Sequence, residues 1–232
     1  MSIMQPKESS RKFINVLSSD GTFRMVVPEG TEGSECREWE TKDGKSGVKH
    51  ELVFETAKGK ITDVQFRDSD YGEQLLVTLE VEDEQEEPVT VSLNTNQPFA
   101  EDFMKKLPNI DLSKDVILRP YNFTDDKDKN RRGMAITQET EGEQTKIQNF
   151  YYDPKQKKPV NGYPAPSGDE STSDDWKVYF IGARKFLVGE TKTFIEKKRE
   201  AGNLKQKTEE KTMDEVYDEI TKDAPNPDGI PF

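Results

Sequence analysis

The fold of this chain is limited above all by a series of runs between positions 48 and 138 in which apolar and polar residues alternate. Residues 61–68 alternate with a period of two, and in residues 74–82 the apolar side chains Leu75, Val77, Leu79 and Val81 all fall on one side. Residues 89–93 repeat the pattern. Period-two runs are typical of half-buried strands. The sequence therefore predicts a mainly β protein with one sheet face turned to a core.

The order of the predicted elements narrows the choice further. Residues 50–68 form one long strand that bends near Gly59, and strands 74–82 and 89–93 follow. Apolar residues then fall at helical spacing between Pro98 and Pro108, which predicts a short helix. Strands 115–124 and 134–138 come last. This order matches the OB-fold, a five-stranded and partly open barrel, and a glycine suits a barrel corner. Another five-stranded meander would share the order.

The flanking segments are predicted as extensions. Residues 13–17 and 22–27 surround an Asp-Gly pair and form a hairpin, and 28–47 read as a loop. Trp39 in that loop is either a lid over a core edge or an exposed stacking surface. Beyond residue 140 we expect a weaker strand pair, best developed at 147–152, a helix over 183–198 and a short helix over 213–221. The predicted domains are an N-terminal hairpin and loop extension (1–47), an OB-fold-like domain with C-terminal strand and helix additions (48–204), and an acidic linker and tail (205–232).

Composition indicates one modest core with solvated extensions. Of the 232 residues, 31% are hydrophobic and 34% are charged. The net charge of -12 argues against nucleic-acid binding if it is taken globally. About half of that excess lies after residue 207, where eight acids face two lysines. An acidic tail can mask a basic groove elsewhere, so charge must be assessed by segment.

Several kinds of chemistry are disfavoured. Cys36 is the only cysteine and His50 the only histidine, so a disulfide framework, a cysteine zinc cluster and most catalytic triads are excluded. We therefore expect no catalytic residues, no metal and no cofactor, and we do not expect an enzyme. No run resembles a signal peptide or approaches 18 apolar residues. A cytoplasmic protein without a membrane partner is expected.

The last residues carry a second signal. An acidic run leads into Asp228-Gly229-Ile230-Pro231-Phe232, which has too little apolar area to order itself. Such a peptide suits capture by a small basic, apolar pocket on another protein. It resembles the C-terminal tip of single-stranded-DNA-binding proteins of the bacterial type, which end in several aspartates followed by Ile-Pro-Phe. Gly229 stands where that family usually has an acid. An ordinary acidic tail that ends in phenylalanine is the alternative.

The tip and the element order together resemble single-stranded-DNA-binding proteins of bacteria and their viruses. Residues 1–47 and 140–207 have no counterpart in that resemblance, and the usual Gly- and Gln-rich linker is missing, so a bacteriophage or divergent member is implied. The resemblance implies sequence-nonspecific binding and protection of single-stranded DNA in DNA replication, recombination and repair, in the host cytoplasm if the chain is viral. It also implies that the tip residues Asp228, Ile230, Pro231 and Phe232 recruit a polymerase, helicase or nuclease.

Candidate DNA-binding residues follow from the physics of single strands, whose bases stack on aromatic rings while phosphates pair with Lys and Arg. Tyr121, Phe123 and Arg119 share one strand face. An aromatic pair at this spacing can equally belong to the core, and Tyr71 and Arg131-Arg132 can be ordinary solvated turns. The full candidate set is Trp39, Lys58, Lys60, Phe66, Arg67, Tyr71, Arg119, Tyr121, Phe123, Arg131 and Arg132.

Two other functional classes remain open. A protein-interaction adaptor, or a mimic of DNA in the replication machinery, would use the acidic surface without binding nucleic acid. A metal-dependent nuclease or hydrolase would use some of the many carboxylates. The sequence leaves the oligomeric state open, and a homo-oligomer is among the alternatives.

Overall fold

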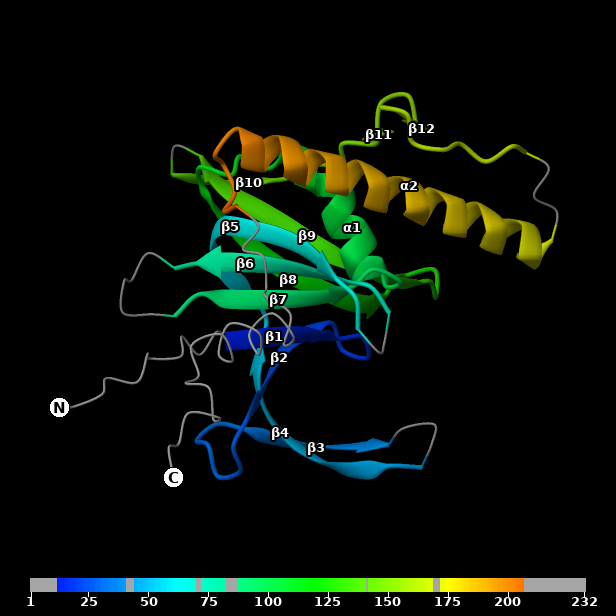
Figure 1. Ribbon diagram of the computed structural model, residues 1–232. Coiled ribbons are helices and arrows are strands. Elements are labelled where there is room, and N and C mark those ends of the chain that lie inside the picture. The colour runs from blue at the N-terminus through cyan, green and yellow to red at the C-terminus, as the bar shows by residue number, and fades with distance from the viewer. Residues whose placement is uncertain are drawn as a thin grey trace, which may run out of the picture.

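The computed structural model describes residues 12–40, 44–69, 72–81, 87–140, 142–168 and 172–206. Tyr71, the helix expected at 213–221 and the acidic tip lie outside the described residues. The described chain is mainly β, with one ten-stranded mixed sheet, a two-stranded sheet and two α-helices (Figure 1). The large sheet has the order β10-β9-β8-β5-β6-β7-β1-β2-β4-β3.

The bounds of the elements agree with the prediction between residues 74 and 124 and depart from it before and after that range. The large sheet contains β1 (Lys12–Leu17), β2 (Thr22–Val27), β3 (Glu35–Glu40), β4 (Ser46–Phe54), β5 (Ala57–Arg67), β6 (Gln74–Glu80), β7 (Val89–Asn94), β8 (Asp115–Thr124), β9 (Asn130–Thr140) and β10 (Glu143–Lys146). The remaining elements are α1 (Pro98–Lys106), a 3₁₀ turn (Leu107–Asn109), β11 (Tyr152–Asp153), β12 (Lys158–Pro159) and α2 (Ser173–Glu200).

Strand β5 is the hub of the sheet because it serves two partners with its two halves. Its first half, from Ala57 to Lys60, pairs with β8, and from Lys60 onward it pairs with β6, across a bulge between Ile61 and Asp63. A Cβ on Gly59 would lie 2.5 Å from the carbonyl oxygen of Glu80. Glycine is therefore needed where three strands converge, as the sequence indicated for a bend.

The expected five-stranded barrel is not found, since no sheet closes among the described residues. Closure would bring β7 against β9, but β7 instead pairs in parallel with β1. The stretch of the β9 edge that β10 leaves open is satisfied by α1: Asp102 Oδ2 accepts from the backbone N–H of Met134 at 2.8 Å, and Lys106 Nζ donates to the Met134 carbonyl at 2.6 Å. The N–H and the carbonyl of Met134 are thus both hydrogen-bonded although β9 does not pair with β7.

The hairpin of β1 and β2 bridges from β7 to β8: β1 pairs with β7, and the turn of the hairpin contacts β8. Its turn packs on β8, where Asn122 Nδ2 donates to the carbonyls of Ser18 and Ser19, both at 2.8 Å. Gly21 has a φ of 68°, and a Cβ there would lie 2.5 Å from the backbone nitrogen of Asn122. The hairpin was expected as an extension, but it is part of the same core and contributes Ile14 and Phe23.

The core lies on the inner face of the coiled sheet, beneath the two helices. Helix α1 buries Phe99 and Phe103, and α2 buries Leu187 and Ile195. The start of α2 is fixed by a capping box between Thr172 and Asp175. Its last turn docks on the part of β5 that has no strand on its β8 side. There Lys205 N–H donates to the Thr62 carbonyl, and Arg199 donates to the Val64 carbonyl.

Four local predictions were wrong. The single bent strand expected over 50–68 is two strands, because β4 ends at Phe54 and pairs with β2 and β3, whereas β5 begins at Ala57 and pairs with β8 and β6. The expected loop at 28–47 contains β3 and the start of β4, which form a hairpin that reaches away from the body and is called the arm below (Figure 1). The strand expected at 147–152 is reduced to the two-residue strand β11, because Phe150 and Tyr151 pack as an aromatic cluster under α2. Helix α2 begins ten residues before the expected position 183. Within the described part of the chain, no helix is both long enough and apolar enough to span a membrane.

The convergence at Gly59 predicts a specific sensitivity. Gly59→Ala should lower the free energy of unfolding by about 1–3 kcal/mol, because its Cβ meets a backbone carbonyl that cannot move independently of β6. Urea unfolding followed by circular dichroism measures this change. The matched control is Gly189→Ala on α2, where a Cβ meets nothing within 4 Å and helix propensity should give equal or higher stability. Equal stability of the two variants would contradict the role given to the convergence.

Candidate nucleic-acid interface

The pairing registers place most of the sequence-predicted residues on the outer face of the large sheet. Residues that are directly paired across strands share a face, and faces alternate along each strand. Following this rule from β9 to β3 puts eight of them on the face opposite the core: Trp39, Lys58, Lys60, Arg67, Arg119, Tyr121, Phe123 and Arg131. We call this surface the outer face.

We use the word station for each of the three places on the outer face that carry an aromatic ring that is at least partly exposed. The first station is the β8–β9 tip. Phe123 is 54% exposed and lies directly opposite Arg131 on β9. Its ring centroid is 5.8 Å from that of Tyr121, with the rings tilted by 43°. Burial raises the pKa of the Tyr121 phenol above its usual value, helped by the Asp102 carboxylate that its hydroxyl contacts at 3.4 Å. Phe123 is therefore the exposed ring of this pair, while Tyr121 is partly buried beside it.

The second station is an open hollow of about 550 Å³ over β1, β6 and β7. Its apolar side is formed by the ring of Phe13, which is 45% exposed, and by Leu76. Asn15, Gln74 and Ser92 add hydrogen-bonding side chains, and the lining also includes Arg67 and its neighbour Asp68. An aromatic ring with nearby amides and hydroxyls can take a flat base and its polar edge.

The third station is the arm. Trp39 lies over Gly47 of the neighbouring strand, and the ammonium of Lys49 is 5.5 Å from the centroid of the indole. Arg37 is paired with Lys49 across the strands and donates two hydrogen bonds to Glu51, at 2.6 and 2.7 Å. Trp39 is thus a partly exposed ring on a projecting sheet face and does not cover the core.

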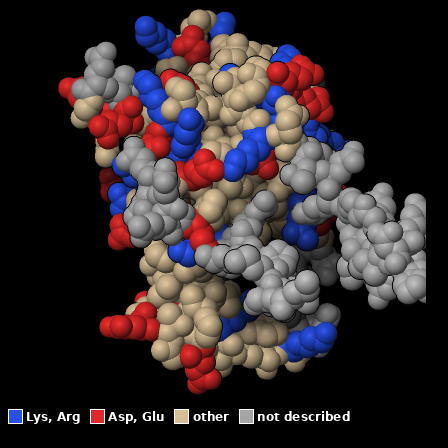
Figure 2. Space-filling model, turned by 60° about the vertical axis from the view of Figure 1, so that its left-hand side comes forward, with Lys and Arg blue, Asp and Glu red and all other residues tan. Residues whose placement is uncertain are grey.

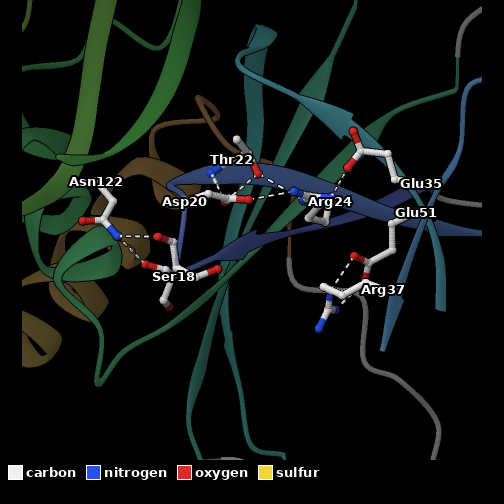
Figure 3. Close-up of polar contacts among 9 residues, drawn as sticks. Ser18, Asp20, Thr22, Arg24, Glu35, Arg37, Glu51 and Asn122 are labelled. Atoms are coloured by element: carbon white, nitrogen blue, oxygen red, sulfur yellow. Dashed lines mark hydrogen bonds and ion pairs between the residues drawn. The ribbon is translucent and has the colours of Figure 1, made fainter. Parts of the chain in front are cut away.

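The turn between β1 and β2 is linked to β8 through Asn122, and the neighbouring Arg24 links it to the arm (Figure 3). Asn122 next to the β8–β9 tip holds this turn, and Asp20 within it accepts from Arg24 at 2.7 Å. Arg24 also donates to Glu35 of the arm at 2.9 Å. Because Arg24 is mostly buried and fully engaged, its role is to position the arm, and it is not a free cation on the surface.

Most of the predicted cations of the outer face are paired with carboxylates that are at least partly exposed. Arg119 pairs with Glu55 at 3.3 Å, Arg131 with Asp125 at 2.9 Å, and Lys58 lies 4.0 Å from Asp115. Figure 2 likewise shows blue and red side chains interleaved over the surface in view. Pairs of this kind contribute little stability, about 0–1 kcal/mol each, so a phosphate can replace the carboxylate at little loss.

The Asp125 carboxylate also organises the loop at the β8–β9 tip. Its Oδ1 accepts from the backbone N–H groups of Lys127 and Lys129, and its Oδ2 accepts from Arg131 Nε. The bond from Lys129 N–H, followed by the Arg131 contact, holds the pKa of Asp125 below its usual range. The loop is therefore fixed by its own backbone contacts even if Arg131 turns to another anion.

Two predicted residues fall elsewhere and one lies outside the described residues. Phe66 is on the core side of β5, half-buried under α2, with Lys192 Nζ 4.8 Å from its ring centroid. Arg132 is opposite Asn122, on the core side of β9, although its side chain is exposed at the strand end. Tyr71 lies outside the described residues, as do the tip residues Asp228, Ile230, Pro231 and Phe232.

Sequence reasoning missed Phe13, Lys49 and Arg37. Phe13 sits in a hairpin that was expected to lie outside the central domain, and its parallel pairing with β7 cannot be deduced from local pattern. The alternation of Glu35, Arg37 and Trp39 with Cys36, Glu38 and Glu40 was the available signal for β3, but charged residues obscured it. Cys36 Sγ lies 3.4 Å from His50 Nδ1 on the other face of the arm. Within the described ranges, His, Cys, Asp and Glu nowhere gather in a group of three that could hold a metal ion.

Comparison with known proteins does not assign a family. No family model matches the sequence, and searches of curated proteins and of solved structures also find no match. The resemblance of the tip and of the element order therefore stays a prediction.

The ion pair at the base of the arm predicts a pH dependence. The hydrogen bonds from Arg37 lower the pKa of Glu51, whose side chain is only 2% exposed. A lowered folded-state pKa adds stability above the unfolded value near 4.5, and this stability is lost as the pH falls through the folded value. Glu51→Gln should destabilise the arm by about 1–3 kcal/mol at pH 7 and by progressively less below pH 4.5.

Trp39 provides the readout. Since the chain has two tryptophans, a Trp176→Phe background leaves Trp39 as the only one, and its fluorescence during urea unfolding reports on the arm. Glu38→Gln, on the opposite face of β3, is the matched control and should show no such pH dependence. A Glu51→Gln effect that is the same at pH 7 and pH 3.5 would refute the assignment.

Proposed function

We propose that the chain binds single-stranded DNA without sequence preference through the outer face of its large sheet, and protects it during replication, recombination or repair. The observation that carries the proposal is the shared face: Phe13, Trp39 and Phe123 are aromatic, at least partly exposed, and accompanied by Lys or Arg. A sheet that serves only to form a hydrophobic core has no need to expose aromatic rings beside cations on its other side.

Stacking supplies the sequence tolerance of this proposal. Every base has a π-face, so an exposed ring accepts any of them, and each stacked base contributes about 1–3 kcal/mol. Phe123 offers one such ring and Phe13 a second within its hollow. The amides of Asn15 and Gln74 favour no single base, because an amide has both a donor and an acceptor.

Phosphate pairing supplies the rest of the affinity. Lys58 and Lys60 lie beside Arg119 on adjacent strands of the outer face, and Arg131 follows across β8. A backbone that passes these groups would replace Glu55 and Asp125 as their partners. Binding of this kind releases counterions and weakens steeply with salt.

The acidic C-terminal region fits the same proposal as a competitor and a recruiter. Its carboxylates would occupy the cations of the outer face when DNA is absent, and DNA would displace them. The tip Asp228, Ile230, Pro231 and Phe232 would then be available to a polymerase, helicase or nuclease. A DNA-binding role of this kind would place the protein in the cytoplasm, where such partners act.

A titration of fluorescent oligo(dT) by anisotropy tests the proposal. Four or five phosphate contacts predict that affinity falls by roughly 50–130-fold between 50 and 200 mM salt. Phe123→Ala should weaken binding by about 5–150-fold, since one stacked base is lost. Lys60→Ala should lower the slope of log affinity against log salt by about 0.7. A chain that ends at residue 206 should bind more tightly than the full chain.

Matched controls come from the small β11–β12 hairpin. Tyr152→Ala removes a ring that is 42% exposed, against 54% for Phe123, and Lys155→Ala removes another exposed cation, both away from the outer face; neither should change affinity. Full-length protein that leaves oligo(dT) unbound at 50 mM salt, with the truncated chain equally inactive, would overturn the proposal. That outcome favours a protein-interaction adaptor or DNA mimic, for which the net charge of -12 is suited.

A further inference from the structure

Residues 176–183 of α2, which follow its polar first turn, are apolar on every side except that of Lys177. Val178 is 71% exposed, Ile181 51%, Phe180 50% and Trp176 40%. A helix that is apolar all round is normally buried, yet this end extends past the sheet that covers the rest of α2 (Figure 1). A solvated surface helix gives no reason for this concentration of large apolar side chains.

The two sides of this helix end differ in what they contact. Trp176, Tyr179 and Phe180 form a cluster of ring contacts with centroids 5.3–5.8 Å apart, and Tyr179 donates to the carbonyl of Pro164. They continue the stripe that buries Ala183 and Leu187. Val178 and Ile181 point away from this stripe. The outward side is therefore the one without a cover in the described chain.

The outward side has a specific composition. At helical spacing it presents Asp174, Val178, Ile181, Gly182 and Lys185 in sequence. A Cβ on Gly182 would meet nothing within 4 Å, so the backbone is open to close approach there. We call these five residues the α2 stripe.

The α2 stripe is complementary to itself. In an antiparallel helix pair, residues face each other when their numbers have a constant sum. A twofold axis between residues 179 and 180 places Val178 opposite Ile181 of the second helix and Asp174 opposite Lys185, each contact occurring twice. Charges of opposite sign thus flank an apolar centre, and Gly182 allows the helices to approach closely.

We propose that two copies of this chain associate through the α2 stripe as an antiparallel, twofold-symmetric helix pair. Twofold self-association needs a self-complementary patch, which this stripe provides. The contact covers about three turns of helix, well below the roughly 800 Å² per partner of a stable interface, so the dimer is weak. The in-chain pair of Asp174 and Lys177 at 2.7 Å is almost fully exposed and does not prevent the exchange of partner.

Sedimentation velocity of the full chain without DNA tests the proposal, over 5–500 µM. The wild type should form dimers with a dissociation constant in the tens to hundreds of micromolar. Val178→Lys should weaken association at least 10-fold, because a charge replaces the apolar centre. Thr193→Lys, exposed on the same helix but beyond the proposed contact, is the control and should associate like the wild type.

A charge swap isolates the intermolecular pair. Asp174→Lys and Lys185→Asp should each weaken association about 10-fold, and the double variant should return to within about 3-fold of the wild type. Rescue cannot arise within one chain, because residues 174 and 185 are roughly 16 Å apart along the helix. The capping box of Thr172 and Asp175 stays intact in every variant, and melting curves check folding.

The possible results decide the proposal in either direction. A concentration-dependent dimer with rescue by the double variant supports it. A monomer at every concentration, or a double variant as weak as the singles, overturns it. A chain that remains monomeric but binds phospholipid vesicles through Val178 assigns the stripe to a lipid surface and also overturns it. Because DNA is absent throughout, failure here does not affect the outer-face proposal.

Discussion

The structure depends on one strand that must serve two neighbours in succession. β5 gives its first half to β8 and its second half to β6, and Gly59 allows the backbones to meet at the change. The sheet must therefore coil, because β8 and β6 leave β5 in different directions. Coiling turns the apolar residues of β5, β6, β7, β8 and β9 inward as a common core. It also prevents β7 from pairing with β9, so other parts of the chain must satisfy the edges of these two strands.

The backbone groups at these edges of β9 and β7 are hydrogen-bonded by side chains of α1 and by the β1–β2 hairpin, respectively. Asp102 and Lys106 of α1 satisfy Met134 on β9, while β1 pairs with β7 and its turn is held by Asn122. The N-terminal hairpin thereby brings Phe13 onto the outer face and anchors the arm through Arg24. Because every residue faces either inward or outward, the same alternation that builds the core also sets rings and cations along the outside. The proposed binding surface is a consequence of how the sheet is completed.

The local sequence pattern predicted individual strands and helix α1, but it could not predict pairings between segments that are far apart in the chain. Alternation located β5, β6, β7 and β8, and the two prolines marked α1 to within a residue or two. The failed barrel closure could not be predicted, because the pairing of β1 with β7 joins segments some 75 residues apart. The arm was missed because β3 consists largely of charged residues, whose strand conformation is imposed by pairing with β4. Among the site residues, the sequence identified Tyr121 and Phe123 as candidates but allowed either a core or a surface position for them. Only the register of β8 with β9 shows that they lie on the outer face.

Amide hydrogen–deuterium exchange with and without oligo(dT) shows whether single-stranded DNA lies on the outer face. DNA binding there should slow exchange in three separate segments: the β8–β9 loop at 124–130, β1 around Phe13, and the arm at 35–49. Exchange in the first turns of α2 and in the β11–β12 hairpin should not change. DNA-dependent protection confined to α2, or binding without protection in any of the three segments, would contradict DNA binding on the outer face.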